Sequence, residues 1–213
     1  MTLPRRSDTL SGPVHTLRTS HGRGLVAVGL RLATATLVVW SSSCVTKTSA
    51  VLDLDGAPID PLAREPAQVT VLLFTRSDCP ISNRYAPEVH RIVERFAPEG
   101  VAFWLVYADP EEAPQAIRQH LLNFGYSLPV ARDMKHELVR LTGARVTPEA
   151  AVFNPAGTMV YRGRIDNRYE DFSVKRNRPS RHDLTDALMS VLARQDPATP
   201  RTKAVGCYIA DLR

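Results

Sequence analysis

The chain has 213 residues, of which 44% are hydrophobic and 23% are charged. These ordinary globular values exclude a largely disordered, collagen-like or polytopic membrane protein, and three cysteines are too few for a disulfide scaffold. The net charge of +5 comes mostly from five arginines in the first 43 residues. Because the remainder is nearly neutral, we expect no nucleic-acid partner.

The first 43 residues have the layout of an export signal. A basic start precedes an apolar run over Leu25–Trp40, which Arg31 interrupts, and three serines then lead into Cys44. Small residues directly before a cysteine resemble a bacterial lipoprotein cleavage site, at which Cys44 would be lipidated. We expect export to the periplasmic side of a bacterial membrane, tethered through lipidated Cys44 or through the leader as a weak anchor. An ordinary cleaved signal is the alternative.

The rest of the chain divides into a polar tether, a folded domain and a tail. The tether covers residues 44–53, the domain 54–195 and the tail 196–213, which carries Cys207. Turn residues within Val51–Asp60 predict an irregular or edge-strand entry into the domain.

The first elements of the domain are a buried strand and an amphipathic helix. Val69–Thr75 is a continuous apolar run rich in β-branched residues, which is typical of a strand buried on both faces of a sheet. From Cys79 to Phe96, apolar residues recur at helical spacing while charged residues share the opposite face. This pattern predicts a helix with one buried stripe.

Strands and helices alternate through the remaining domain, and the last helix has Ser180 or Asp183 available as its cap. This alternation, closed by a hairpin and a helix, predicts an α/β fold with a mixed central sheet and helices on both faces. The expected strands are Val101–Tyr107, Leu128–Ala131, Ala150–Phe153 and Met159–Arg162, and the expected helices are Glu111–Phe124, Met134–Leu141 and His182–Arg194.

Cys79 is the main candidate for chemistry because it lies between a buried strand and the first turn of a helix. Backbone N–H groups and the helix dipole stabilise a thiolate there, and Pro80 suits the first helical position. Arg76 would lower the pKa of the thiol, whereas Asp78 would raise it. The sequence does not decide which of the two side chains lies nearer.

Several positions form a pattern: Cys79 follows the first core strand, Pro87 lies within the following helix, and Val146-Thr147-Pro148 precedes the hairpin. The runs DCPISNRYAPEV, YRGRIDNRY and VGCYI extend the pattern over Leu54–Ile209. It resembles the thioredoxin superfamily, and more closely the bacterial redoxin-domain proteins of the AhpC/TSA (alkyl hydroperoxide reductase/thiol-specific antioxidant) family. The resemblance implies a thioredoxin-like three-layer sandwich.

The resemblance also implies a cis peptide bond between Thr147 and Pro148, beside the active cysteine. The cis form of an X-Pro bond costs only about 0.5–1 kcal/mol, and the backbone before it would pair with a partner peptide. A trans proline that ends a loop is the structural alternative. The substrate-binding residues expected around the nucleophile are Ser77, Asp78, Pro80, Thr147 and Pro148.

Two departures from the family patterns bear on the mechanism. Ser82 replaces the second cysteine of C-x-x-C, so any resolving thiol must come from elsewhere in the chain, from a partner or from a small molecule. Arg76 and Leu72 occupy the threonine and proline positions of the peroxiredoxin pattern P-x-x-x-T-x-x-C. Cys207 is the internal candidate for the resolving thiol, and a static disulfide or two unpaired cysteines are the alternatives.

No cofactor is expected, and the metal alternative is weak. Sco-type copper chaperones of the same fold use C-x-x-x-C with a distant histidine, but the fourth position after Cys79 is Asn83. One thiolate is a poor Cu(I) site, and we expect His90 and His136 to be solvent-facing or hydrogen-bonded. We therefore predict no metal.

Seven basic residues lie between Arg162 and Arg181, against three acidic ones. Such a run could dock an acidic partner or lie on anionic lipid headgroups. A solvated surface loop is the simpler interpretation, and it is the one we expect.

The sequence thus predicts a thiol-disulfide oxidoreductase with Cys79 as nucleophile and a protein or small-molecule thiol or disulfide as partner. Peroxide reduction through a sulfenic acid on Cys79 is the second enzyme hypothesis. A non-catalytic binding module with two structural cysteines is the third. An acidic Cys79 thiol would favour the redox hypotheses over the third.

Overall fold

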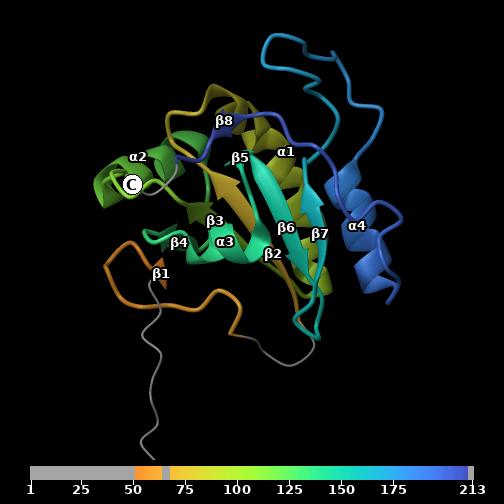
Figure 1. Ribbon diagram of the computed structural model, residues 1–213, viewed down its shortest axis with the longest axis horizontal. Coiled ribbons are helices and arrows are strands. Elements are labelled where there is room, and N and C mark those ends of the chain that lie inside the picture. The colour runs from red at the N-terminus through yellow and green to blue at the C-terminus, as the bar shows by residue number, and fades with distance from the viewer. Residues whose placement is uncertain (1–50, 64–67, 211–213) are drawn as a thin grey trace, which may run out of the picture. The chain divides into compact units, whose positions relative to one another are not determined.

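The computed structural model describes residues 51–63 and 68–210 of the chain (Figure 1). The leader, Cys44 and most of the expected tether lie outside these residues, so the predictions made for them stay predictions. Within the described ranges, none of the helices has the length and hydropathy needed to cross a membrane.

A six-stranded mixed sheet forms the centre of the domain, in the order β1-β4-β3-β2-β6-β7. Strand β3 runs parallel to both β2 and β4, whereas the pairs β1–β4, β2–β6 and β6–β7 are antiparallel. A second sheet pairs β5 with β8 antiparallel. The strands are β1 (Val51–Leu52), β2 (Val69–Thr75), β3 (Val101–Tyr107), β4 (Val130–Asp133), β5 (Val146–Thr147), β6 (Glu149–Phe153), β7 (Met159–Gly163) and β8 (Cys207–Tyr208).

Helices cover both faces of the central sheet, as predicted. Val71 and Leu73 of β2 join residues of α1 and α4 in one apolar cluster. Leu72 and Phe74 point to the opposite face, where they pack in a second cluster with a residue of α3. The helices are α1 (Pro80–Phe96), α2 (Pro114–Phe124), α3 (Glu137–Thr142) and α4 (Asp183–Leu192), and a short 3₁₀ helix η1 (Ala97–Glu99) follows α1.

The predicted bounds of β2 and β3 match the structure, and the expected edge strand is β1, at one end of the sheet. The start predicted for α2 is wrong by three residues, because Pro114 takes the first helical position. The residues before it form a turn instead, in which the N–H groups of Glu111 and Glu112 donate to the side chain and carbonyl of Asp109.

The start predicted for α3 is also three residues early. His136 before the helix has a φ of 53°, in the left-handed region, which breaks the helical run. The buried Asp133 carboxylate at the end of β4 then accepts the N–H groups of Glu137 and Val139, at 2.6 and 2.8 Å. A strand end thus supplies the cap of the next helix.

The predicted cap of α4 is wrong. His182 precedes the helix and makes no capping hydrogen bond through its side chain. Ser180 bonds reciprocally with Asn167 instead, at 2.9 Å in both directions. Asp183 lies within the first helical turn, where it forms an ion pair with Arg164 at 2.7 Å.

The described part of the C-terminal tail crosses the top of the domain in Figure 1 and ends in β8. It is fixed beside β7, because the N–H of Arg162 donates to Pro200 O at 3.0 Å and the N–H of Thr202 donates to Arg162 O at 3.1 Å. The Thr202 hydroxyl also lies 2.7 Å from the hydroxyl of Tyr161. These contacts bring the tail to the end of the sheet at which α1 begins.

Candidate active site

Cys79 is the N-cap residue of α1 and is fully buried, with 0% of its surface exposed. Its backbone is extended, and Pro80 begins the helix. The N–H of Ser82 donates to Cys79 Sγ at 3.5 Å. The sulfur therefore occupies the position of a capping oxygen, where a helix N-terminus favours negative charge.

The loop of β5 lies directly against this sulfur. The Cys79 thiol donates a hydrogen bond to Thr147 O at 3.1 Å. The Thr147–Pro148 peptide bond is cis, as the resemblance implies. Thr147 and Pro148 are both buried, so they form the inner wall of the site.

The tail brings the second thiol to the same place. Cys207 in β8 is the register partner of Thr147 in β5, and its thiol lies close enough to that of Cys79 for each to shift the pKa of the other. Both cysteines are free thiols. Two residues that are 128 positions apart in the sequence are thus neighbours.

The two thiols have opposite acidities. Burial would raise the pKa of Cys79, but the neighbouring Cys207 thiol, the hydroxyl and N–H of Ser82 and the Thr147 side chain bring it below its ordinary value. Burial, the neighbouring Cys79 side chain and its charge raise the pKa of Cys207 to about 12. Cys79 is therefore the more acidic thiol of the pair.

Arg76 and Asp78 do not decide the acidity of Cys79. They form an ion pair with each other, 2.6 Å apart, and Arg76 also lies 3.3 Å from Asp109. Their charges act on Cys207, whose pKa Asp78 raises and Arg76 lowers. The sequence left open which charge lies nearer to Cys79, and the ion pair between the two explains why neither dominates.

Ser82 has a role that sequence reasoning missed, because the sequence identified it only as the absent second cysteine. Its hydroxyl and that of Thr147 are buried and have no hydrogen-bond partner of their own, and both lower the pKa of Cys79. Its position three residues after the cap was the available signal, since that residue's N–H and side chain face the cap.

A buried network holds the loop before Cys79. The N–H of Ser77 donates to Glu112 at 3.0 Å, and the amide of Asn83 donates to Ser77 O at 2.9 Å. His120 Nε2 lies 2.8 Å from Asn83 Oδ1, and its other ring nitrogen lies 2.7 Å from the Tyr107 hydroxyl. Burial lowers the pKa of His120, so the neutral ring is favoured. Ser77 is thus partly buried, whereas Asp78 and Pro80 are exposed at the rim.

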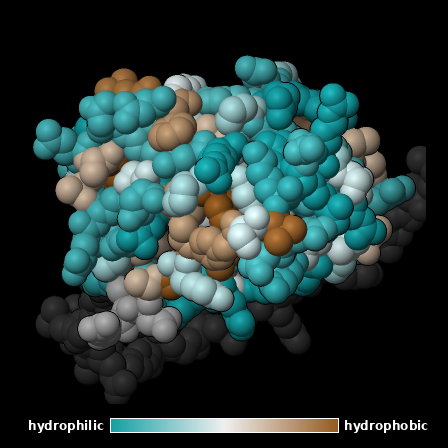
Figure 2. Space-filling model, turned by 90° about the horizontal axis from the view of Figure 1, so that it is seen from above, coloured by the Kyte–Doolittle hydropathy of each residue, from teal (hydrophilic) through white to brown (hydrophobic). Residues whose placement is uncertain are grey.

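This end of the molecule is seen face-on in Figure 2, where a small apolar area is surrounded by hydrophilic surface. The basic loop between β7 and α4 rises beside it in Figure 1. Three of its arginines form ion pairs within the domain, which fits the predicted surface loop better than a docking site. Those three are Arg164, Arg168 and Arg176, and Arg162 at the end of β7 also pairs, with Glu149.

The model of the AhpC/TSA family matches residues 48–162, which include Cys79 and Thr147. The chain belongs to the AhpC/TSA family. Its fold is thioredoxin-like, and redox chemistry is the general function associated with such proteins. The family match ends before the tail, so Cys207 lies outside it.

Two solved structures with TM-scores above 0.5 share this fold. An uncharacterised conserved protein from Geobacillus kaustophilus is 22% identical with a TM-score of 0.65, and covers 77% of this chain and 88% of its own. A hypothetical protein from Sinorhizobium meliloti 1021 is 21% identical with a TM-score of 0.64, over 75% of this chain and 88% of its own. A secreted Mycobacterium tuberculosis disulfide oxidoreductase is 18% identical with a TM-score of 0.46, over 68% of this chain and 93% of its own. No curated protein matches the sequence.

The histidines considered as copper ligands are engaged elsewhere in this AhpC/TSA protein. His90 Nε2 lies 2.8 Å from Phe124 O, and His136 Nε2 lies 2.6 Å from Ala108 O. Each of these ring nitrogens donates to a backbone carbonyl oxygen, so neither is directed at Cys79.

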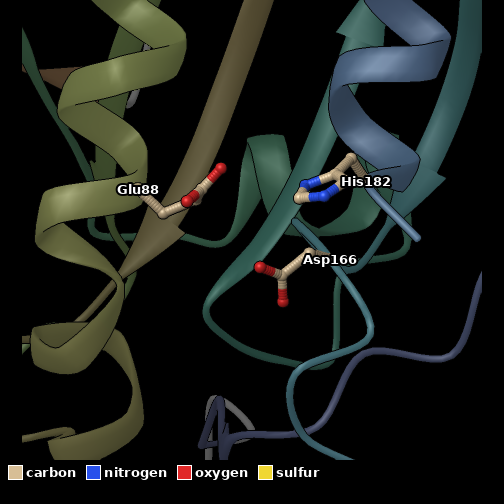
Figure 3. A group of neighbouring side chains, drawn as sticks. All are labelled: Glu88, Asp166 and His182. Carbon is tan, nitrogen blue, oxygen red and sulfur yellow. The ribbon is translucent and has the colours of Figure 1, made fainter. Parts of the chain in front are cut away.

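Within the described residues, one group of side chains has metal-ligand spacing. It comprises Glu88 of α1, Asp166 after β7 and His182 before α4, with ligand atoms within 4.8 Å of one another (Figure 3). Arg168 lies 3.5 Å from Asp166 and 3.7 Å from Glu88, and Arg91 also pairs with Glu88. Because two guanidinium groups already neutralise the two carboxylates, the group is an ion-pair network joining α1 to the loop after β7.

Proposed function

We propose that this protein is an exported thiol-disulfide oxidoreductase in which Cys79 is the nucleophile and Cys207 resolves the intermediate. The observation that carries the proposal is that Thr147 contacts both thiols: it pairs with Cys207, and its carbonyl oxygen lies 3.1 Å from the buried Cys79 Sγ. The pKa of Cys79 is lowered there and that of Cys207 is raised. Such a pair separates the roles of attacking thiolate and proton-bearing thiol before any substrate binds.

In the first step, the Cys79 thiolate attacks one sulfur of a partner disulfide. A bond forms between Cys79 Sγ and that sulfur, the partner's S–S bond breaks, and its other sulfur leaves as a thiolate. The backbone of Thr147 and the Thr147–Pro148 wall line the approach, with Ser77, Asp78 and Pro80 at the rim. The partner is a protein or small-molecule disulfide.

In the second step, Cys207 attacks Cys79 Sγ in the mixed disulfide. The pKa of Cys207 is raised partly by the negative charge of Cys79, and that charge disappears when Cys79 enters the mixed disulfide. Cys207 then gives its proton to a departing partner thiolate and forms the Cys79–Cys207 disulfide. The partner gains two electrons, one proton from Cys207 and one proton from solvent, and an external dithiol returns the chain to its reduced form.

Peroxide reduction is the second candidate, and the complete burial of Cys79 favours it because a peroxide is smaller than a peptide. The Cys79 thiolate would take one peroxide oxygen as sulfenic acid and release the other as an alcohol or water. Cys207 would then form the disulfide with loss of water. Arg76 and Leu72 in place of threonine and proline keep thiol-disulfide exchange as the first choice.

The lowered pKa of Cys79 argues against a non-catalytic binding module, since a merely structural thiol needs no acidic environment. The test of the proposed function uses Cys79→Ser and Cys207→Ser, with the exposed Lys203→Ala as a control. Cys79→Ser should abolish disulfide reduction, and Cys207→Ser should accumulate mixed disulfides. Full turnover by Cys79→Ser would refute the proposal, and consumption of peroxide but not of disulfides would favour the peroxidase.

Export is part of the proposal and is supported by the layout of residues 1–43 before Cys44. Intact mass spectrometry of protein from the native membrane fraction tests it. A diacyl adduct on an N-terminal Cys44 is the expected result. An unlipidated chain that retains its leader and stays in the cytoplasmic fraction would contradict both export and lipidation.

A further inference from the structure

Strand β8 lies on the edge of β5 that a partner peptide needs under the proposed function. Val146 pairs with Tyr208, and Thr147 pairs with Cys207. Extended peptides bind exposed strand edges by this kind of pairing. The chain's own tail therefore occupies the position of a partner, with Cys207 beside Cys79 in place of a partner's cysteine.

The tail is fixed at both ends of this crossing. Before it, Thr202 is bonded to Arg162 and Tyr161 of β7. After it, the N–H of Ile209 donates to Arg145 O at 3.0 Å. The segment between these anchors covers Cys79, whose exposed fraction is 0%.

Side chains of the segment alternate between the domain and the solvent. Val205, Cys207 and Ile209 are partly buried and pack against the two apolar clusters, while Tyr208 is 77% exposed. This alternation is that of a strand bound along one face. The site thus holds apolar side chains two residues before and two residues after the cysteine.

Gly206 lies too close to the wall of the site for any side chain. A Cβ on this residue would overlap Thr147 O and lie 2.6 Å from the Thr147 carbonyl carbon and 3.1 Å from Pro148 N. These are backbone atoms of a buried loop, which cannot move aside as a flexible side chain can. The close approach of β8 to the backbone of Thr147 and Pro148 therefore requires glycine directly before the cysteine.

We propose that the segment Val205–Ile209 is an internal occupant of the partner-docking edge of β5, and that partners displace it with an extended segment of the form apolar-glycine-cysteine-any-apolar. The inference rests on the proposed function and adds to it the substrate class and the competition between tail and partner. The tail copies the partner's backbone path, so only one of the two can pair with Thr147 at a time.

The first test measures how fast iodoacetamide alkylates Cys79 in the reduced full-length protein, with peptide mass spectrometry as the readout. Gly206→Ala should release the segment and accelerate alkylation of Cys79 by about ten-fold, because a protected group reacts through local opening. Lys203→Ala, which changes an exposed residue outside the segment, should react as the wild type does. An unaccelerated Gly206→Ala variant would overturn the proposal.

The second test leaves Gly206 intact and uses the Cys207→Ser variant with two synthetic peptides. One has the sequence AVGCYIA and the other has alanine in place of its glycine, and the cysteine of each carries nitrothiobenzoate in a disulfide. The Cys79 thiolate attacks the peptide sulfur, a Cys79–peptide disulfide forms, and nitrothiobenzoate leaves as a coloured thiolate. The glycine peptide should react about ten-fold faster, because only it fits against Thr147; equal rates would overturn the proposal.

A third reaction, of the same Cys207→Ser variant with the symmetric disulfide of nitrothiobenzoate, distinguishes failure of this inference from failure of the proposed function. If Cys79 reacts with that reagent but does not distinguish the peptides, thiol exchange stands and the glycine requirement falls. If Cys79 reacts with neither the reagent nor the peptides, the proposed function itself falls, and the inference falls with it.

Discussion

Cys79 Sγ lies 3.1 Å from the carbonyl oxygen of Thr147, to which its thiol donates a hydrogen bond. The same residue pairs with Cys207 of β8. One residue of the cis-proline loop therefore sets the distance between the two thiols. The chemistry proposed for the site depends on this spacing more than on any charge at the surface.

Oxidation should join the two thiols directly. In a Cys44→Ser variant, mild oxidation should lower the intact mass by two hydrogens, and peptide mapping should locate the link between Cys79 and Cys207. Cys79→Ser and Cys207→Ser each keep only one of the two thiols, so neither monomer should lose two hydrogens. Only a disulfide-linked dimer of either variant could show that loss. Retention of two alkylatable thiols after oxidation would mean that β8 does not bring the sulfurs within bonding distance.

The hydroxyl of Ser82 should control the acidity of Cys79. Because it lowers the pKa of Cys79, Ser82→Ala should raise that pKa and shift the alkylation profile of Cys79 to higher pH. Alkylation follows the thiolate, so its rate near neutral pH should fall by roughly three-fold. Ser190→Ala, which removes a hydroxyl bonded to Asp186 O on α4, serves as the control. An unmoved profile in Ser82→Ala would exclude a direct role for the hydroxyl.

Local patterns in the sequence predicted the fold well, and long-range pairing limited the prediction of the site. The run Val69–Thr75 and the helix after Cys79 are visible in the sequence because each depends on its own periodicity. The contact between Thr147 and Cys79 followed only from the family resemblance. The pairing of Cys207 with Thr147 was beyond reach, because nothing near Cys207 specifies a strand partner some 60 residues away.

The helix starts show the same limit on a smaller scale. Apolar spacing placed the start of α3 at Met134, but the left-handed backbone of His136 delays it. The cap comes from Asp133, which belongs to the preceding strand. Periodicity does not encode such a contact, so sequence reasoning could give the helix but not its first residue.

Asp133 should stabilise the fold through this cap. Asp133→Ala removes two backbone hydrogen bonds from a residue with no exposed surface, so the free energy of unfolding should fall by about 2 kcal/mol. Denaturant unfolding of the reduced protein measures this change. Asp196→Ala, at an exposed position, should change stability by less than about 0.5 kcal/mol. A similarly small effect of Asp133→Ala would show that other groups satisfy the start of α3.

Glu149 should act as a positioning residue for the β5 loop. Its buried carboxylate accepts the N–H groups of Arg145 and Val146, at 2.8 and 3.4 Å, and lies 3.5 Å from Arg162. Glu149→Ala should lower the free energy of unfolding by about 2 kcal/mol. It should also shift the alkylation profile of Cys79 to higher pH, because displacement of β5 removes the Thr147 side chain that lowers the pKa of Cys79.

Two further variants separate positioning from mere stability. Glu149→Gln keeps an oxygen that can accept the same N–H groups, so it should retain most of the stability and leave the pH profile near that of the wild type. Glu94→Ala, on the exposed face of α1, should change neither measurement. If Glu149→Ala loses stability while the pH profile of Cys79 stays in place, Glu149 supports the fold alone. The geometry of Thr147 would then be held by its pairing with β8.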